Sequence, residues 1–278
     1  RMRWPRAHIT ILPPKGDLFN GWCVADRVLA AGEPLYEAPF AHTFITWSSR
    51  IPECTASCDL GRVHRSEGVY ARWLLKPEAE QNMKTIRRLG YRGPTPPLYV
   101  SLRKPAEPIP PSSLRIALIP GGKPEHRWRH KRWPYYRPLV EALLAQYPDS
   151  RLCIIGARDD EFPGELPDAP QILDFRGRFT LRETAWVLKH CDLAIGNDCG
   201  PMHIADAVMT PSIVIFGPTC ALKNGPVYRG MPLSRDAACS PCQYDPPLRD
   251  SCQDPRCMEE LGVDTVLREA DRTLADRA

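Results

Sequence analysis

The chain has 278 residues, 43% hydrophobic and 25% charged, with a formal net charge of +4 at pH 7. This length predicts one large or two modest domains, and the composition is that of an ordinary globular protein. The chain contains no apolar run near the ~20 residues of a membrane-spanning helix and no apolar signal-peptide core at its beginning, so we expect a soluble protein of the cytoplasm.

The first part of the chain, up to about residue 104, has an irregular pattern. Its predicted elements are strands at His8–Leu12, Thr43–Trp47 and Leu98–Leu102 and a helix at Lys76–Leu89. A proline-rich segment at 105–111 predicts a linker. We therefore expect one domain over residues 1–111, linker included, and a second over 112–278.

The second part alternates short apolar runs with helical patterns. Predicted strands lie at Leu114–Pro120, Arg151–Gly156, Ile172–Gly177, Asp192–Gly196 and from Ser212, and predicted helices lie at Tyr135–Tyr147, after the capping box Thr180–Glu183, and from Gly200. Strands that alternate with helices of this length predict an α/β domain with a parallel sheet and helices on both faces, which is a Rossmann-like domain.

The segment Asn197–Ala207 carries the clearest chemical signal. It lies between two predicted strands and places a carboxylate, Asp198, directly before a helix that begins at Gly200. The N-terminal end of a helix exposes backbone N–H groups and favours anions, and strand ends of parallel sheets are common ligand sites. The segment therefore predicts a site for an anionic ligand such as a sugar nucleotide.

Six motifs occur in the order found in one enzyme family. They are Gly121-Gly122 after a strand, Lys131-Arg132-Trp133-Pro134, Gly177–Glu183, Asn197–Ala205, Phe216–Thr219, and a cysteine-rich tail that starts at Cys239. Together, over about residues 112–266, they resemble the bacterial heptosyltransferases of glycosyltransferase family 9. The resemblance implies a GT-B fold, in which two Rossmann-like domains face a cleft. Residues 112–278 would then bind the donor nucleotide, and residues 1–111 would form the acceptor side.

The resemblance also implies roles for individual residues. Lys131 would neutralise the leaving diphosphate, as a point charge can, and Asp198 would bind hydroxyls of the donor. These two residues are the catalytic candidates. The full donor-binding set is Gly121, Gly122, Lys131, Asp198, Cys199, Gly200, Pro201, Met202, His203 and Thr219.

Simpler interpretations of the same residues stay open. Lys131 could be an ordinary surface lysine, Asp198 a helix cap, and His203 a packing histidine. Cys199 stands where the family has Ser or Thr, and a thiol is a weaker hydrogen-bond partner. Thr219 could simply end a strand.

The beginning of the chain departs from the family pattern. Pro5–Leu12 resembles the family's second strand, so we expect the first strand and helix to be lacking. In the family, the loop after that first strand carries the carboxylate that deprotonates the acceptor. The sequence Lys15-Gly16-Asp17 imitates that motif but follows the second strand, so we assign no general base.

Three functions stay open at this point. The leading one is an inverting transferase that moves heptose from an ADP-heptose-type donor to a lipopolysaccharide core sugar or a protein hydroxyl. The second is a non-catalytic scaffold or nucleotide-sugar-binding protein, and the third is a GT-B enzyme with another nucleotide sugar. We expect no catalytic metal, no nucleic-acid partner and at most peripheral membrane contact. A homo-oligomer is one option for the assembly.

Four cysteines cluster near the end of the chain. Cys239, Cys242, Cys252 and Cys257 are separated by two, nine and four residues, which suits tetrahedral thiolate coordination of a structural metal. Zinc and iron both accept four thiolates, and paired or free thiols are the alternative. The knuckle at 239–257 also resembles the four-cysteine iron finger of autotransporter heptosyltransferases.

Overall fold

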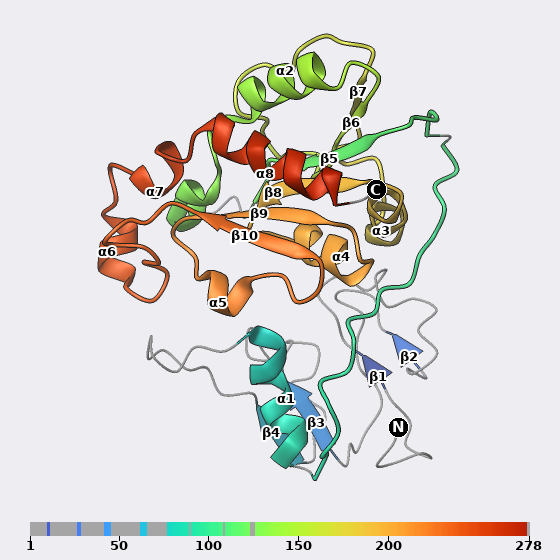
Figure 1. The fold of residues 1–278 in the computed structure, drawn as a ribbon. Coiled ribbons are helices and arrows are strands. Elements are labelled where there is room, and N and C mark those ends of the chain that lie inside the picture. Colours follow the sequence, from blue (N-terminus) through green and yellow to red (C-terminus); the bar gives the residue numbers. More distant parts are fainter. Residues whose placement is uncertain are drawn as a thin grey trace. The chain divides into compact units, whose positions relative to one another are not determined.

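The chain divides into two compact units, Arg1–Ser101 and Leu102–Ala278, and each is described by itself. The structure is a computed structural model, shown in Figure 1. It describes residues 10–11, 27–28, 42–45, 62–65, 77–88, 90–107, 109–122 and 126–276.

The described elements of the first unit are four short strands and one helix. They are β1 (Thr10–Ile11), β2 (Arg27–Val28), β3 (His42–Ile45), β4 (Arg62–Arg65) and α1 (Glu78–Arg88). β1 pairs with β2 and β3 pairs with β4, both in parallel. The helix predicted at 76–89 is confirmed, β1 falls within the strand predicted at His8–Leu12, and β3 overlaps the one predicted at Thr43–Trp47.

One predicted strand in this part of the chain is wrong. Leu98–Leu102 forms no strand, and Leu98 and Tyr99 are 37% and 60% exposed. An apolar run becomes a strand only when its backbone pairs with a neighbour, and no ladder includes this segment in the described part of the chain. Pro5–Ala7, the start of the segment compared with the family's second strand, and the sequence Lys15–Asp17 lie outside the described residues.

The second unit is built on a six-stranded, fully parallel sheet with the order β10-β9-β8-β5-β6-β7. The strands are β5 (Arg115–Ile119), β6 (Arg151–Ile154), β7 (Ile172–Asp174), β8 (Leu193–Asn197), β9 (Ser212–Phe216) and β10 (Gly230–Ser234). Read from β7, their sequence order is 3-2-1-4-5-6, which is the Rossmann order. The predicted parallel α/β domain is confirmed, and β10 is an additional strand that the patterns do not predict.

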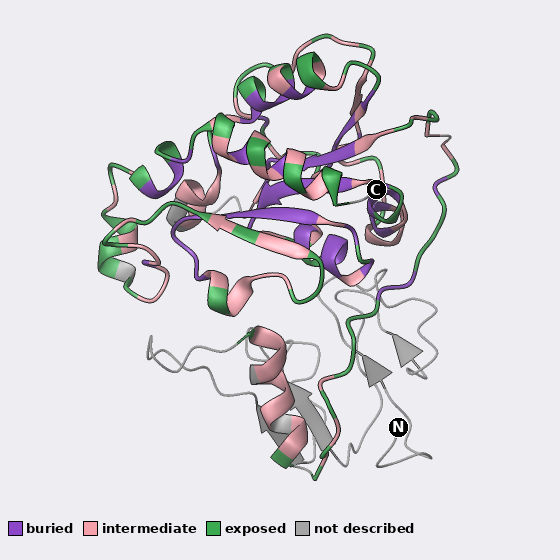
Figure 2. Cartoon of the chain, in the orientation of Figure 1, coloured by how far each residue is buried: buried purple, intermediate pink, exposed green. Residues whose placement is uncertain are grey.

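Helices cover both faces of this sheet. Those of the second unit are α2 (Tyr136–Gln146), α3 (Leu181–Lys189), α4 (Gly200–Ala207), α5 (Ala221–Asn224), α6 (Pro246–Asp250), α7 (Arg256–Glu259) and α8 (Val263–Ala275), with a 3-10 helix, η4 (His126–Lys131), before α2. α2 contacts α8, which packs on β8 and β9, whereas α4 packs on the same strands and on α3. Figure 2 shows that the central strands are buried.

Side-chain alternation along the strands fills two cores. Ile116 and Leu118 of β5 join the cluster beneath α2 and α8, which includes Trp133 and Tyr136, both fully buried. On the α4 side, Gly196 of β8 allows a close approach, because a Cβ there would lie 2.5 Å from Met202 Sδ. Strand residues therefore alternate between these two layers, as strand geometry requires.

The strand order reverses between β5 and β8, which run parallel and are neighbours in the sheet but lie far apart in the sequence. In doubly wound sheets, ligands bind at such a switch point, outside the carboxyl ends of the strands. Here β5 ends before Gly121-Gly122, and β8 ends before Asp198. The two strongest sequence motifs therefore meet at the position where the topology favours a ligand.

Candidate functional site

An ion pair between Lys131 and Asp198 forms the centre of the candidate site. Lys131 Nζ lies 3.1 Å from Asp198 Oδ2, and the two side chains are only 12% and 5% exposed. Lys131 is the last residue of η4, and Asp198 directly follows β8. The surface-lysine interpretation is therefore wrong, because this ammonium group is largely buried against a carboxylate.

Three further side chains surround Asp198. Asn224 Nδ2, at the end of α5, donates a 3.0 Å hydrogen bond to Asp198 Oδ2, and His203 Nε2 lies 3.9 Å from Oδ1. Thr219, a residue that is 4% exposed, also lowers the pKa of this carboxylate, although its hydroxyl makes no hydrogen bond of normal geometry in the described residues. Asn224 is a site residue that the sequence did not predict.

These neighbours keep Asp198 ionised. Burial raises the pKa of Asp198, but the nearby Lys131 ammonium group lowers it, and the hydrogen-bonding and cationic neighbours lower it further. The net pKa lies below the ordinary value for an aspartate. The site therefore holds a fixed carboxylate beside a fixed cation.

Asn197, next to Asp198, holds the surrounding loops together. Its Nδ2 donates to the carbonyls of Pro120 (2.7 Å) and Gly121 (3.2 Å). Its Oδ1 accepts from the backbone N–H of Trp133 (3.1 Å) and from the hydroxyl of Tyr136 (3.2 Å). One fully buried amide thus joins the ends of β5 and β8 to the chain that follows Lys131.

The two glycines after β5 have different surroundings. A Cβ on Gly121 would lie 2.3 Å from the carboxyl carbon of Asp160, whereas a Cβ on Gly122 would meet open space. Asp160 Oδ2 itself accepts a 2.7 Å hydrogen bond from the Ala157 N–H. Gly121 is therefore needed for packing against Asp160, and Gly122 lies where backbone could approach a ligand.

The residues at the start of α4 lie in distinct surroundings. Cys199 is the N-cap, and its side chain makes no capping hydrogen bond. Burial raises the pKa of this thiol to about 12, so it is neutral at pH 7. A Cβ on Gly200 would meet open space, Pro201 is half-buried, and Met202 is buried against Gly196.

The loop after β6 carries three acidic residues, Asp159, Asp160 and Glu161. Glu161 Oε2 lies 3.5 Å from Arg132 Nη1 and is 86% exposed. Trp133 is fully buried, and its Nε1 donates to the carbonyl of Leu261 at 2.8 Å. The Lys-Arg-Trp-Pro motif therefore places one buried anchor two residues after the site lysine.

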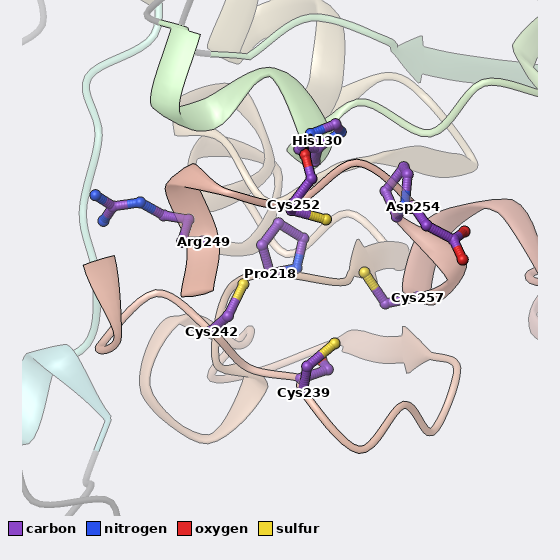
Figure 3. A pocket seen from close by; sticks show the side chains of 10 residues that line it. His130, Pro218, Cys239, Cys242, Arg249, Cys252, Asp254 and Cys257 are labelled. Carbon is purple, nitrogen blue, oxygen red and sulfur yellow. Dashed lines mark hydrogen bonds between the residues drawn. The ribbon is translucent and has the colours of Figure 1, made fainter. Parts of the chain in front are cut away.

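A second feature of the unit is a pocket formed by the four clustered cysteines. Cys239, Cys242, Cys252 and Cys257 line it together with His130, Pro218 and Arg249, and all four thiols are free. Figure 3 shows their sulfur atoms gathered around the same space. The structure thus brings together four thiols that the sequence spacing predicted to meet.

The environment of Cys242 and Cys257 favours the protonated thiol. Burial raises the pKa of Cys257 to about 12 and raises that of Cys242, and the neighbouring cysteines raise both further. In the described residues, no three His, Cys, Asp or Glu side chains are arranged as a formed metal site. The donor set nevertheless suits a tetrahedral thiolate centre, because four sulfur ligands face one pocket.

No helix among the described residues is long and apolar enough to cross a membrane.

Comparison with known protein families identifies the family to which this part of the chain belongs. Residues 112–248 match glycosyltransferase family 9 (heptosyltransferase). The matched range contains the Lys131–Asp198 pair, the Gly121-Gly122 turn and Thr219. Residues 112–248 therefore form a glycosyltransferase family 9 domain, and the family predicted from the sequence motifs is confirmed.

Two curated relatives of the chain are named as heptosyltransferases. The chain is 32% identical over 138 residues to lipooligosaccharide heptosyltransferase 2 of Haemophilus influenzae, a match that covers 46% of this chain and 33% of the relative. It is also 32% identical over 153 residues to lipooligosaccharide heptosyltransferase 2 of Campylobacter jejuni, covering 52% of this chain and 47% of that protein. The matched segments thus span half or less of these relatives.

Solved structures show the same fold. ADP-heptose LPS heptosyltransferase II of E. coli superimposes with a TM-score of 0.67 at 14% identity, covering 99% of this chain and 92% of that one. The iron-containing dodecameric glycosyltransferase TibC of enterotoxigenic E. coli gives a TM-score of 0.58 at 16% identity, covering 81% and 62%. The expected α/β fold of the GT-B heptosyltransferases is confirmed.

Proposed function

We propose that the protein is an inverting glycosyltransferase that moves heptose from an ADP-heptose-type donor to a lipopolysaccharide core sugar or a protein hydroxyl. One observation carries the proposal: the Lys131–Asp198 pair, 3.1 Å apart, lies at the switch point of a parallel sheet in a family 9 domain. Lys131 and Asp198 present a buried cation and a buried carboxylate side by side. A sugar diphosphate needs both kinds of partner.

The roles of the two side chains follow from their charges. Lys131 would contact the diphosphate and stabilise the negative charge that develops as the bond between the anomeric carbon and the phosphate oxygen breaks. Asp198, kept ionised by its neighbours, would accept hydrogen bonds from donor hydroxyls. Gly122, with open space beside its α-carbon, would let backbone approach the phosphates.

The reaction balances as a single displacement. The acceptor hydroxyl oxygen forms a bond to the anomeric carbon on the face away from the diphosphate, ADP leaves with the bonding electron pair, and the acceptor proton passes to a base. The family places that base after its first strand, and the sequence motifs of this chain identify no counterpart for it. Donor binding is therefore derived from named side chains, and the base is not assigned.

The choice of ADP-heptose is supported by relatives. Several curated relatives are named as lipopolysaccharide or lipooligosaccharide heptosyltransferases. TibC, which shares the fold at a TM-score of 0.59, has a structure in complex with ADP-D-β-D-heptose. An ADP-sugar of this class is the donor that this domain would bind, and we expect the protein to act in the cytoplasm.

A transfer assay with the full chain tests the proposal. Purified protein is incubated with ADP-heptose and either a lipopolysaccharide core acceptor or an acceptor polypeptide, and ADP release is measured beside thermal shifts for ADP- and UDP-sugars. We expect the largest shift with ADP-heptose and acceptor-dependent ADP release. Binding without release would favour a nucleotide-sugar-binding scaffold, a stronger response to a UDP-sugar would favour another donor, and no binding of any nucleotide sugar would refute the proposal.

We propose further that Cys239, Cys242, Cys252 and Cys257 hold one structural metal ion, zinc or iron. The support is that four free thiols line one pocket, and that TibC, of the same fold, is iron-containing. A bound ion would crosslink the chain around the pocket and lower the pKa of each thiol that it binds. The ion would have no role in the transfer reaction.

Metal analysis of the purified full chain tests this second proposal. We expect one zinc or iron atom per chain, lost when Cys242 and Cys257 are both replaced by serine. A chain purified without metal that also fails to bind added Zn²⁺ or Fe²⁺ under reducing conditions would refute it. TibC is dodecameric, and light scattering on the same samples tests whether this chain forms a homo-oligomer.

A further inference from the structure

The cysteine segment, residues 239–257, contacts two parts of the chain that carry residues of the candidate site. This segment contains α6 and part of α7 and lines the cysteine pocket. Its contacts reach η4, which ends on Lys131, and also the chain after β9, which contains Thr219. A structural crosslink distant from the site would not need either set of contacts.

The first set of contacts fixes η4. Arg129 Nη2 donates a 3.0 Å hydrogen bond to the carbonyl of Cys252, and His130 Nε2 lies 3.1 Å from the same oxygen. Both residues directly precede Lys131. One carbonyl of the cysteine segment thus binds the last turn of the helix that presents the site cation.

The second contact is a stack of charged groups on one aromatic ring. Lys131 Nζ lies 5.4 Å from the centroid of the Trp128 ring, and Arg249 Cζ lies 5.0 Å from the same centroid. Arg249 is 12% exposed and is paired with Asp250 at 2.8 Å, which fixes its direction. Trp128 therefore links Lys131 to Arg249, an ion-paired residue of α6.

The third set of contacts reaches Thr219 from both sides. Gln243 N–H donates to the Pro218 carbonyl at 2.9 Å, and the Cys220 N–H donates to Gln243 Oε1 at 3.1 Å. The residue between them is Thr219, whose hydroxyl lowers the pKa of Asp198. Gln243 of the cysteine segment therefore forms hydrogen bonds with the residues on both sides of Thr219, a third member of the site.

We propose that the cysteine segment positions the donor-site cation, with Arg249, Trp128 and Arg129 as positioning residues for Lys131 and Gln243 as the positioning residue for Thr219. The effect on donor affinity rests on the proposed function, whereas the effect on η4 does not. Any change that displaces this segment weakens the site without touching a residue that contacts the ligand. The geometry thereby couples the cysteine pocket to donor binding.

The test compares two arginines of the same segment. Arg249→Ala removes the cation over Trp128, and Arg256→Ala is the matched control, because Arg256 pairs with Asp254 at 2.7 Å and is 69% exposed. Hydrogen exchange of the backbone over residues 128–133 is measured first, without ligand. We expect faster exchange than in wild type for Arg249→Ala and the wild-type rate for Arg256→Ala. Equal exchange rates in the two variants would overturn the proposal.

A second measurement separates positioning from general stability. Titration of the full chain with ADP should show about fivefold weaker binding for Arg249→Ala, which corresponds to losing one cation–π contact, with recovery in Arg249→Lys and no change in Arg256→Ala. Thermal unfolding shows whether the variants stay folded. If wild type binds no ADP, the proposed function fails, and the exchange comparison still decides the positioning role. If wild type binds ADP and Arg249→Ala binds equally well, the coupling to donor affinity is refuted.

Discussion

Replacing Lys131 by methionine should destabilise the second unit in a way that depends on pH. Asp198 is 5% exposed, so the substitution leaves a buried carboxylate without its cation. Removing one partner of a buried pair typically costs about 3–5 kcal/mol. Asn224 still donates a 3.0 Å hydrogen bond to Asp198, so we expect the lower end, about 3 kcal/mol at pH 7.

The pKa of Asp198 determines how the stability cost of Lys131→Met changes with pH. In wild type the pKa of Asp198 is below its ordinary value, so its contribution to stability is present above the unfolded pKa and is lost as pH falls through the folded pKa. In Lys131→Met, burial remains and the main lowering influence is gone, so the pKa rises above the unfolded value. The cost is then largest at neutral pH and shrinks as pH falls through that raised pKa.

Urea unfolding followed by circular dichroism measures this difference at pH 7 and at pH 4.5. The control is the double variant Lys131→Met with Asp198→Asn, in which no buried charge is left unpaired. We expect it to be more stable than Lys131→Met alone at pH 7. A cost below about 0.5 kcal/mol, the level of an ordinary surface substitution, or a cost that does not change with pH, would refute the argument.

Four other substitutions test the surroundings of the site, each by thermal or urea unfolding. Asn197→Asp should lower the free energy of unfolding by at least about 3 kcal/mol, because a carboxylate cannot donate to the two carbonyls that the amide binds. Tyr136→Phe removes only a hydroxyl and should lower it by about 1 kcal/mol. Equal losses in the two variants would contradict the assigned hydrogen bonds. Cys199→Ser should stabilise by about 1 kcal/mol, because a hydroxyl can cap α4 where the thiol does not, and a loss of stability would argue against an open cap. Gly196→Ala should cost about 1–3 kcal/mol through its clash with Met202, and an unchanged melting temperature would show that α4 can move away.

The sequence predicts the sheet of the second unit well, because buried strands and helix starts leave local signals. Thr180 and Glu183 form the capping box that their spacing indicates, and Asp198 follows a strand at the switch point. The amphipathic helix α8 also leaves such a signal, with Val266 and Ala270 buried one turn apart, although no helix is predicted there. Local periodicity is therefore sufficient for strands β5 to β9 and for helices α2, α3 and α4.

Other features depend on contacts that no local pattern encodes. Asn224 reaches Asp198 from a four-residue helix, and nothing in the sequence links the two positions. β10 contains Pro232 and is half-exposed along its length, so it lacks the apolar alternation of a strand. The contact between Arg129 and Cys252 likewise joins residues more than a hundred positions apart. Such features follow from tertiary packing and become visible only in the folded chain.

The most direct test of the central claim is a calorimetric titration of the full chain with ADP, made for wild type, Lys131→Met and Lys189→Met. Lys189 is an exposed lysine at the end of α3 and serves as the matched control. We expect one ADP site per chain, binding about thirtyfold weaker in Lys131→Met, as loss of one charged phosphate contact implies, and unchanged binding in Lys189→Met. Absence of ADP binding in wild type, or equal affinity in wild type and Lys131→Met, would contradict the account.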